Sequence, residues 1–160
     1  MKPHVEALRR QGIDAATVPG AGKLPTRAER AADMFLAAAG DRLGSTVLGG
    51  QSYGGRVASL VAASRGCAAL LLFSYPLHPP GRPESLRTEH WPAIKCPVLL
   101  LSGESDTFAR IDVLRREISK LAQAELVTYP NAGHGLKGPH LDDALARAAQ
   151  FVLALQGHKL

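Results

Sequence analysis

The chain is poor in cysteine and aromatic residues and lacks long apolar segments. It contains two cysteines among 160 residues, and its aromatic content is only 5%. It has no run of about 18 apolar residues, the length that a membrane-spanning helix needs. The N-terminus, Met1-Lys2-Pro3-His4-Val5, lacks the apolar segment of a secretory signal peptide. We therefore expect no membrane partner and a cytoplasmic protein.

The chain also lacks a dense basic run. The formal net charge is +5, but the basic residues are scattered in pairs such as Arg9-Arg10 and Arg115-Arg116, without interleaved aromatic residues. Such pairs on a helix are usually a solvated face. We expect no nucleic-acid partner.

Metal-binding patterns are missing as well. Cys67 and Cys96 fit none of the zinc spacings, and His78, His90 and His140 are too far apart in sequence for a recognisable metal motif. We expect no metal and no organic cofactor. The cysteines are interpreted as reduced, packed thiols. A disulfide remains the alternative, because both cysteines lie at the starts of predicted neighbouring strands.

What the sequence does contain is an alternation of strand-like and helix-like segments. This alternation predicts an α/β fold with a mostly parallel sheet and helices on both faces, as a single domain over residues 1–160. Thr26 is expected to cap a helix, with Glu29 completing a capping box. The expected helices cover residues 3–11, 26–39, 54–64, 111–121 and 141–155, and the expected strands cover 13–18, 46–48, 67–73, 97–101 and 125–129.

Gly50-Gln51-Ser52-Tyr53-Gly54 matches the pattern G-x-S-x-G between a predicted strand and a predicted helix. A serine on so sharp a turn has strained backbone angles, and we expect glycine to be needed for steric reasons at both flanking positions. The helix that follows would point its N-terminus at the site. The amide of Tyr53 could then face a developing oxyanion. The motif makes Ser52 a candidate nucleophile.

Two further segments supply the partners that a serine nucleophile needs. A buried strand is followed at once by Asp106, and another strand is followed by the glycine-flanked His134. The order Ser, Asp, His is the one that α/β hydrolases use, and α/β sheets place their sites at strand carboxyl ends. His134 would act as general base, and Asp106 would orient it. Glu104 is the alternative acid.

Gly20-Ala21-Gly22-Lys23 resembles a phosphate-binding loop but fails its pattern. Thr17 stands where an earlier glycine is required, and Leu24 replaces the Ser or Thr after the lysine. We reject a phosphate loop here.

The chain resembles the small, uncapped α/β hydrolases described as dienelactone-hydrolase-like, a group that also includes testis-expressed hydrolase-like proteins and a chromatin-complex subunit. The proline-rich excursion at 75–95 is the most specific part of the match. The resemblance covers nearly the whole chain and implies the triad Ser52, Asp106 and His134. The matching stretches are Gly49-Gly50-Gln51-Ser52-Tyr53-Gly54-Gly55-Arg56, Tyr75-Pro76-Leu77-His78-Pro79-Pro80-Gly81-Arg82-Pro83, Leu86-Arg87-Thr88-Glu89-His90-Trp91, and the loops of Asp106 and His134.

The chain departs from this group at its start. Members usually begin with further strands and a His-Gly-rich loop that supplies a second oxyanion amide, so the fold expected here is N-terminally shortened. Three interpretations are open: the sequence is a fragment, the strand at 13–18 pairs with 46–49 in a five-stranded sheet, or a partner covers the exposed edge. We favour a small sheet with a homodimer.

Two functions compete at this point. The first is a serine hydrolase, expected to be a carboxylesterase for small or medium acyl esters, with one pocket wall formed by the excursion through Leu77, His78 and Trp91. The second is a catalytically weak or inactive interaction module, which the missing strands favour. The loss of one oxyanion donor typically costs about a hundred- to a thousand-fold in rate.

Overall fold

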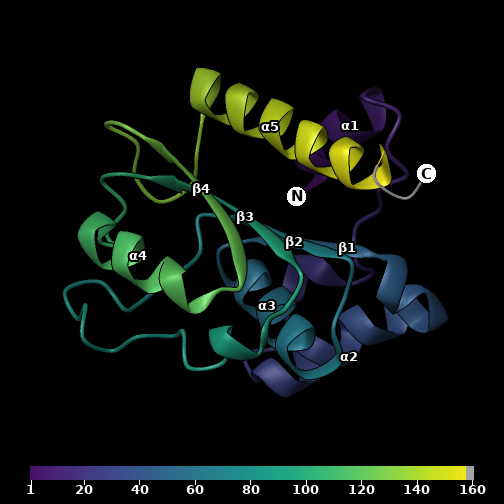
Figure 1. Ribbon diagram of the computed structural model, residues 1–160, viewed down its shortest axis with the longest axis horizontal. Helices are drawn as coiled ribbons and strands as arrows, with labels where there is room; N and C mark the ends of the chain where they lie inside the picture. The colour runs from purple at the N-terminus through teal and green to yellow at the C-terminus, as the bar shows by residue number, and fades with distance from the viewer. Residues whose placement is uncertain (158–160) are drawn as a thin grey trace.

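A sheet of parallel strands forms the centre of the molecule (Figure 1). The computed structural model describes residues 1–157 of the chain. Within them the sheet has four strands in the order β1-β2-β3-β4, and every neighbouring pair is parallel. The strands are β1 (Val47–Gln51), β2 (Ala69–Phe73), β3 (Pro97–Gly103) and β4 (Gln123–Tyr129). All carboxyl ends therefore meet at one edge of the sheet, as the sequence pattern predicted.

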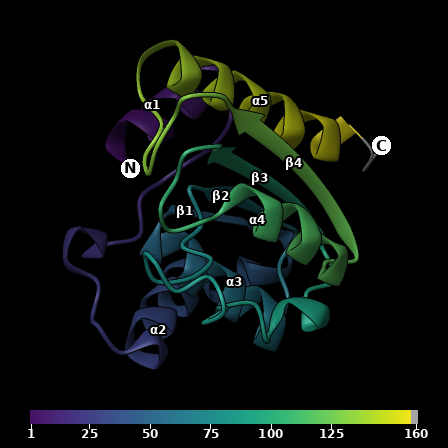
Figure 2. The same ribbon diagram turned by 90° about the vertical axis from the view of Figure 1, so that its left-hand side faces the viewer.

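Helices cover both faces of this sheet, which confirms the expected layers (Figures 1 and 2). Side chains of the buried strands alternate between two apolar clusters. Leu70, Leu72 and Leu100 pack toward one set of helices, and Leu71 and Leu99 pack toward the other. The first set is α2 (Ala28–Ala39), α3 (Tyr53–Arg65) and α4 (Ile111–Glu117); the second is α1 (Lys2–Arg10) and α5 (Gly138–Gly157). In residues 1–157, no helix is both long enough and apolar enough to cross a bilayer.

The expected strand at 13–18 is wrong. These residues form no strand, and the sheet ends at β1. Ile13 packs into the cluster under α1 and α5, whereas Val18 packs against the cluster on the opposite face. The segment therefore crosses the edge of the sheet from one face to the other and does not run along it (Figure 2).

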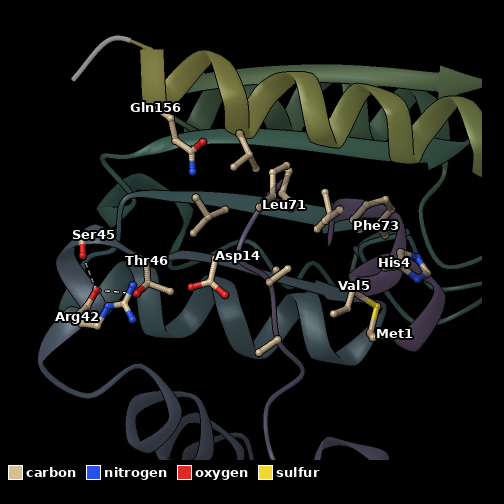
Figure 3. Close-up of a pocket in the computed structure, with 17 residues that line it drawn as sticks. Met1, His4, Val5, Asp14, Arg42, Ser45, Thr46, Leu71, Phe73 and Gln156 are labelled. Atoms are coloured by element: carbon tan, nitrogen blue, oxygen red, sulfur yellow. Dashed lines mark hydrogen bonds between the residues drawn. The ribbon is translucent and has the colours of Figure 1, made fainter. Parts of the chain in front are cut away.

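A cavity of about 280 Å³ separates this segment from β1. Its walls include Asp14 from the crossing segment, Thr46 and Val47 at the edge strand, and His4 on α1 (Figure 3). Helices α1 and α5 and strand β2 line the same cavity, and the crossing segment does not pair with β1. Whether a second copy of the chain covers this edge stays a prediction.

The start of α2 also differs in detail from the expectation. Arg27 is the N-cap residue, and no side chain caps the helix. The predicted capping box of Thr26 and Glu29 is therefore wrong. The Thr26 carbonyl instead accepts a hydrogen bond from the Tyr53 hydroxyl at 3.2 Å, as does the Pro25 carbonyl at 2.8 Å.

Candidate active site

Ser52 occupies the sharp turn between β1 and α3. Its backbone angles are φ 53° and ψ −124°, a region that residues with a side chain rarely adopt. Two hydrogen bonds hold the turn: the Ser52 amide donates to the Phe73 carbonyl at 2.9 Å, and the Arg56 amide donates to the Ser52 carbonyl at 3.1 Å. The strained serine is thus fixed by the neighbouring strand on one side and by the first turn of α3 on the other.

The two glycines of the motif serve different purposes. A Cβ on Gly50 would lie 2.6 Å from the Gly54 carbonyl oxygen, well inside van der Waals contact. A Cβ on Gly54 would meet only Leu24 Cδ1 at 3.9 Å. The expectation that both positions need glycine for steric reasons is therefore correct for Gly50 and wrong for Gly54. The crowding at Gly50 comes from the backbone of α3, and Gly55 belongs to the same close approach.

A continuous chain of hydrogen bonds joins Ser52, His134 and Asp106. Ser52 Oγ lies 2.8 Å from His134 Nε2, and His134 Nδ1 lies 2.9 Å from Asp106 Oδ2. A carboxylate only accepts hydrogen bonds, so Nδ1 carries the proton and Nε2 is free to accept from the serine hydroxyl. The structure brings together the three residues that the sequence proposed as a set.

Phe108 supports both the acid and the histidine. Its backbone N–H donates to Asp106 Oδ1 at 2.8 Å, and its ring lies 4.4 Å from the imidazole of His134, centroid to centroid. The Asp106 side chain has no exposed surface, whereas that of His134 is 26% exposed. The histidine therefore faces solvent on one side while its orienting carboxylate is shielded. Sequence reasoning missed Phe108, because an aromatic residue in a loop carries no signal of its own.

Glu104, the alternative acid, lies elsewhere. Its Oε1 accepts a hydrogen bond from Thr128 Oγ1 at 2.8 Å and lies 3.7 Å from Arg115. His134 is therefore hydrogen-bonded to Asp106, whereas Glu104 contacts residues of β4 and α4.

The loop that carries His134 is held from two directions. The Ser105 amide donates to the Ala132 carbonyl at 2.9 Å, and the Gly135 amide donates to Ser74 Oγ at 3.2 Å. Ser74 is buried, directly follows β2, and has a positive φ of 51°. In the sequence, the only indication of this role was that Ser74, a polar residue, directly follows the wholly apolar strand β2.

Tyr53 is the first residue of α3, so its N–H has no acceptor within the helix. It directly follows Ser52 and is held in place through its own hydroxyl, which donates to the carbonyls of Pro25 and Thr26. The turn is thereby tied to the segment that precedes α2.

The three side chains expected to form a pocket wall lie in the interior, which corrects that expectation. Leu77 and Trp91 are fully buried in the cluster under α3, and His78 is 2% exposed. Both ring nitrogens of His78 are occupied: Nδ1 donates to the Pro79 carbonyl at 2.8 Å, and Nε2 accepts from the Arg110 amide at 3.0 Å. The excursion folds back and buries its own apolar residues, so these three side chains stabilise it.

A second serine–histidine pair lies beneath α3. Ser59 Oγ is 2.7 Å from His90 Nε2, about the same distance as in the pair of Ser52. Ser59 is fully buried and also donates to the Arg56 carbonyl at 2.6 Å, so it accepts from the histidine. Burial lowers the pKa of His90. The hydrogen bond of this pair holds the excursion against α3. The Ser59 hydroxyl is not accessible to solvent.

No group of three or more His, Cys, Asp or Glu residues within 1–157 is arranged to hold a metal ion.

The fold and this geometry agree with the comparisons with known proteins. A family model described as an alpha/beta hydrolase domain matches residues 14–154. The chain belongs to the alpha/beta hydrolase family. Within this family, the narrower dienelactone-hydrolase-like resemblance is compatible with the match and stays a prediction.

Solved structures of this family superpose on most of the chain. Est1E from Butyrivibrio proteoclasticus is 16% identical with a TM-score of 0.73, over 97% of this chain and 82% of that one. A monoacylglycerol lipase from Paleococcus ferrophilus is 14% identical with a TM-score of 0.71, over 81% and 76%. The esterase domain of a Rhodothermus marinus protein is 18% identical with a TM-score of 0.64, over 96% and 78%. At these identities the likeness shows the alpha/beta hydrolase fold.

Proposed function

We propose that this α/β hydrolase is a serine hydrolase that cleaves carboxylic esters of small or medium acyl chains. The observation that carries the proposal is the unbroken hydrogen-bond chain from the Ser52 hydroxyl through His134 to the buried Asp106. The strained backbone of Ser52 supports it, because a serine that served only to join a strand to a helix would not need such angles.

In the proposed reaction, Ser52 Oγ attacks the acyl carbon while His134 Nε2 takes the hydroxyl proton. The resulting tetrahedral intermediate collapses, His134 returns the proton to the leaving alcohol, and an acyl–serine ester remains. Water, deprotonated by the same histidine, then releases the acid. Asp106 stays ionised throughout and stabilises the imidazolium that forms twice in each cycle.

The former carbonyl oxygen of each tetrahedral intermediate is negatively charged and needs a hydrogen-bond donor close to it. We assign this role to the backbone amide of Tyr53, which starts α3 next to the nucleophile. The position at the N-terminus of a 13-residue helix adds a favourable partial charge.

The choice of esters rests on the named relatives. The solved structures similar to this chain include the esterase domain of a Rhodothermus marinus protein and a monoacylglycerol lipase from Paleococcus ferrophilus. The partly exposed side chain of His134 favours a site that is open to solvent, and such a site suits small or medium acyl groups better than long ones.

The test is labelling of the purified full chain with a fluorophosphonate probe, which reacts with activated serines. We expect wild type to label, and Ser52→Ala and His134→Ala to lose labelling. Ser59→Ala is the matched control: it removes a serine with a histidine hydrogen bond of nearly equal length, but one that is buried. We expect Ser59→Ala to label like wild type.

Two results would contradict the proposal. Labelling that persists in Ser52→Ala would place the nucleophile elsewhere. Well-folded wild type that does not label at all would favour the second candidate, a non-catalytic interaction module. The free outer edge of β1 in the described residues favours that candidate, because an unpaired strand edge is a site for association.

A further inference from the structure

The two cysteines of the chain lie side by side, far from the active site. Cys67 precedes β2 and Cys96 directly precedes β3, two strands that pair in parallel from Leu70 and Val98 onward. Their sulfur atoms are 3.8 Å apart, and both residues are half-buried. Because Ser52 and His134 follow the carboxyl ends of strands, the cysteine pair occupies the opposite end of the sheet.

Both cysteines line a hollow at the surface. Its walls carry small residues from the end of α3 and from the segment before β3, together with the cation of Lys95: Ala62, Ala63, Gly66, Ala93 and Lys95 are among them. The Lys95 ammonium, which donates a hydrogen bond to the Pro92 carbonyl at 2.8 Å, places a positive charge at the rim of this hollow. A small, anionic reagent can therefore reach the sulfur atoms from solvent.

We infer that Cys67 and Cys96 form a dithiol site that closes to an intramolecular disulfide by exchange with a low-molecular-weight disulfide such as oxidised glutathione. A disulfide needs about 2.05 Å between the sulfurs, so the pair must approach by roughly 1.8 Å from its present separation of 3.8 Å. Two half-buried side chains at the starts of neighbouring strands can make this approach by rotation about their Cα–Cβ bonds.

The exchange balances in two steps. The Cys96 thiolate attacks the small disulfide, forms a mixed disulfide and releases one thiolate. Cys67 then attacks Cys96 Sγ and releases the second thiolate, so that two protein thiols are oxidised and one small disulfide is reduced to two thiols. The two protons from the cysteines end on the two released thiolates.

The order of attack follows from the contact between the sulfurs. The hydrogen bond from Cys67 lowers the pKa of Cys96, and the same hydrogen bond, with burial second, raises the pKa of Cys67. Cys67 is also the thiol whose S–H donates to a backbone carbonyl, that of Ala69 at 3.3 Å, which favours its protonated form. We therefore assign Cys96 as the thiol that reacts first and Cys67 as the resolving thiol.

We expect the disulfide to stabilise the fold and to have little effect on the reactivity of Ser52. It would close a loop from 67 to 96 that contains the whole proline-rich excursion, with its buried Tyr75, Leu77 and Trp91. Closing such a loop restricts the unfolded chain, and we expect the thermal midpoint to rise by about 5–10 °C. Because the bond forms at the far end of the sheet, we expect the rate of labelling at Ser52 to stay within about twofold.

The test exposes the reduced full chain to oxidised glutathione and follows the intact mass. We expect wild type to lose two hydrogen masses, a dithiol reductant to restore them, and peptide mapping to join the peptides of the two cysteines. Cys67→Ser should instead accumulate the mixed disulfide at Cys96, because the resolving thiol is gone. Cys96→Ser should react much more slowly.

Three results would overturn the inference. In the first, wild type retains two alkylatable thiols after equilibration with oxidised glutathione. In the second, it accumulates a stable mixed disulfide, as Cys67→Ser is expected to do. In the third, it forms disulfide-linked dimers. All three are read on wild type, so they hold even if a serine variant fails to fold, and none depends on hydrolase activity.

Discussion

Gly50 offers the sharpest test of how this fold presents its nucleophile. A methyl group at position 50 would meet the Gly54 carbonyl oxygen at 2.6 Å, whereas a methyl group at position 54 would find only Leu24 Cδ1 at 3.9 Å. The two positions flank Ser52 symmetrically in sequence. Gly50→Ala and Gly54→Ala are therefore chemically identical changes with opposite steric consequences.

The expected loss of rate in Gly50→Ala follows from how far β1 and α3 must move apart to admit the methyl group. Ordinary contact begins near 3.4 Å. The Gly54 carbonyl oxygen would lie at 2.6 Å and the Gly54 carbonyl carbon and Gly55 nitrogen closer still, so β1 and the first turn of α3 must separate by at least about 0.8 Å to admit the Gly50 methyl group. Ser52 lies between them, and its hydroxyl must stay 2.8 Å from His134 Nε2. A misplacement of about 1 Å in an active site can cost roughly a hundredfold in rate. We expect that loss for Gly50→Ala and less than twofold for Gly54→Ala.

The assay is the second-order rate of fluorophosphonate labelling, paired with the steady-state rate on a short-chain nitrophenyl ester. Circular dichroism and the thermal midpoint establish whether Gly50→Ala remains folded. If both variants react at the wild-type rate, the close approach of β1 to α3 does not position Ser52, and the reasoning is refuted. If Gly54→Ala is the slower of the two, the steric assignment is reversed.

The remaining predictions concern the side chains around the site and one at the sheet edge. Asp106→Asn should lower the ester hydrolysis rate by about 10⁴, since an amide can hold the wrong histidine tautomer, while Glu104→Gln stays near wild type; equal losses would mean that the acid is misassigned. Phe108→Ala should slow labelling about tenfold and Phe108→Tyr should restore it, because the ring restrains the imidazole; no change in Phe108→Ala would remove this role. Burial, followed by the nearby amino terminus, lowers the pKa of His4 to about 4, so the unfolded chain binds a proton that the folded chain does not. Stability should therefore fall between pH 6.5 and 4, by about 2 kcal/mol at pH 5, and denaturant titrations of His4→Leu should lack that part of the slope.

Much of the sheet was predictable because its strands carry strong local signals. The apolar runs before Phe73 and Gly103 are buried on both faces, as continuous hydrophobic runs in parallel sheets are expected to be. The glycine-flanked Ser52 and His134 stand directly after predicted strands, so the direction of the chain already placed them at one edge.

Other features depended on the whole structure. Residues 13–18 end at Pro19-Gly20 as a strand would, but Ile13 and Val18 pack against clusters on opposite faces of the sheet, and the local sequence does not reveal that arrangement. Leu77 and Trp91 were placed at a pocket wall only from their position in the proline-rich excursion. In fact the excursion closes over α3, and its apolar residues fill the core.

The position of His134 poses a geometric problem that the fold solves with backbone contacts. Neighbouring strands lie about 4.8 Å apart, so the end of β4 is some 14 Å from the end of β1, where Ser52 stands. The loop after β4 must therefore turn back across the ends of β3 and β2. It does so by lying directly on Gly103, where a Cβ would come within 2.6 Å of the Gly133 carbonyl oxygen, and by donating the Gly135 amide to Ser74 at the end of β2. The two inner strands thus support the histidine, and a side chain at position 103 would push the loop away from the sheet and so displace His134 from Ser52.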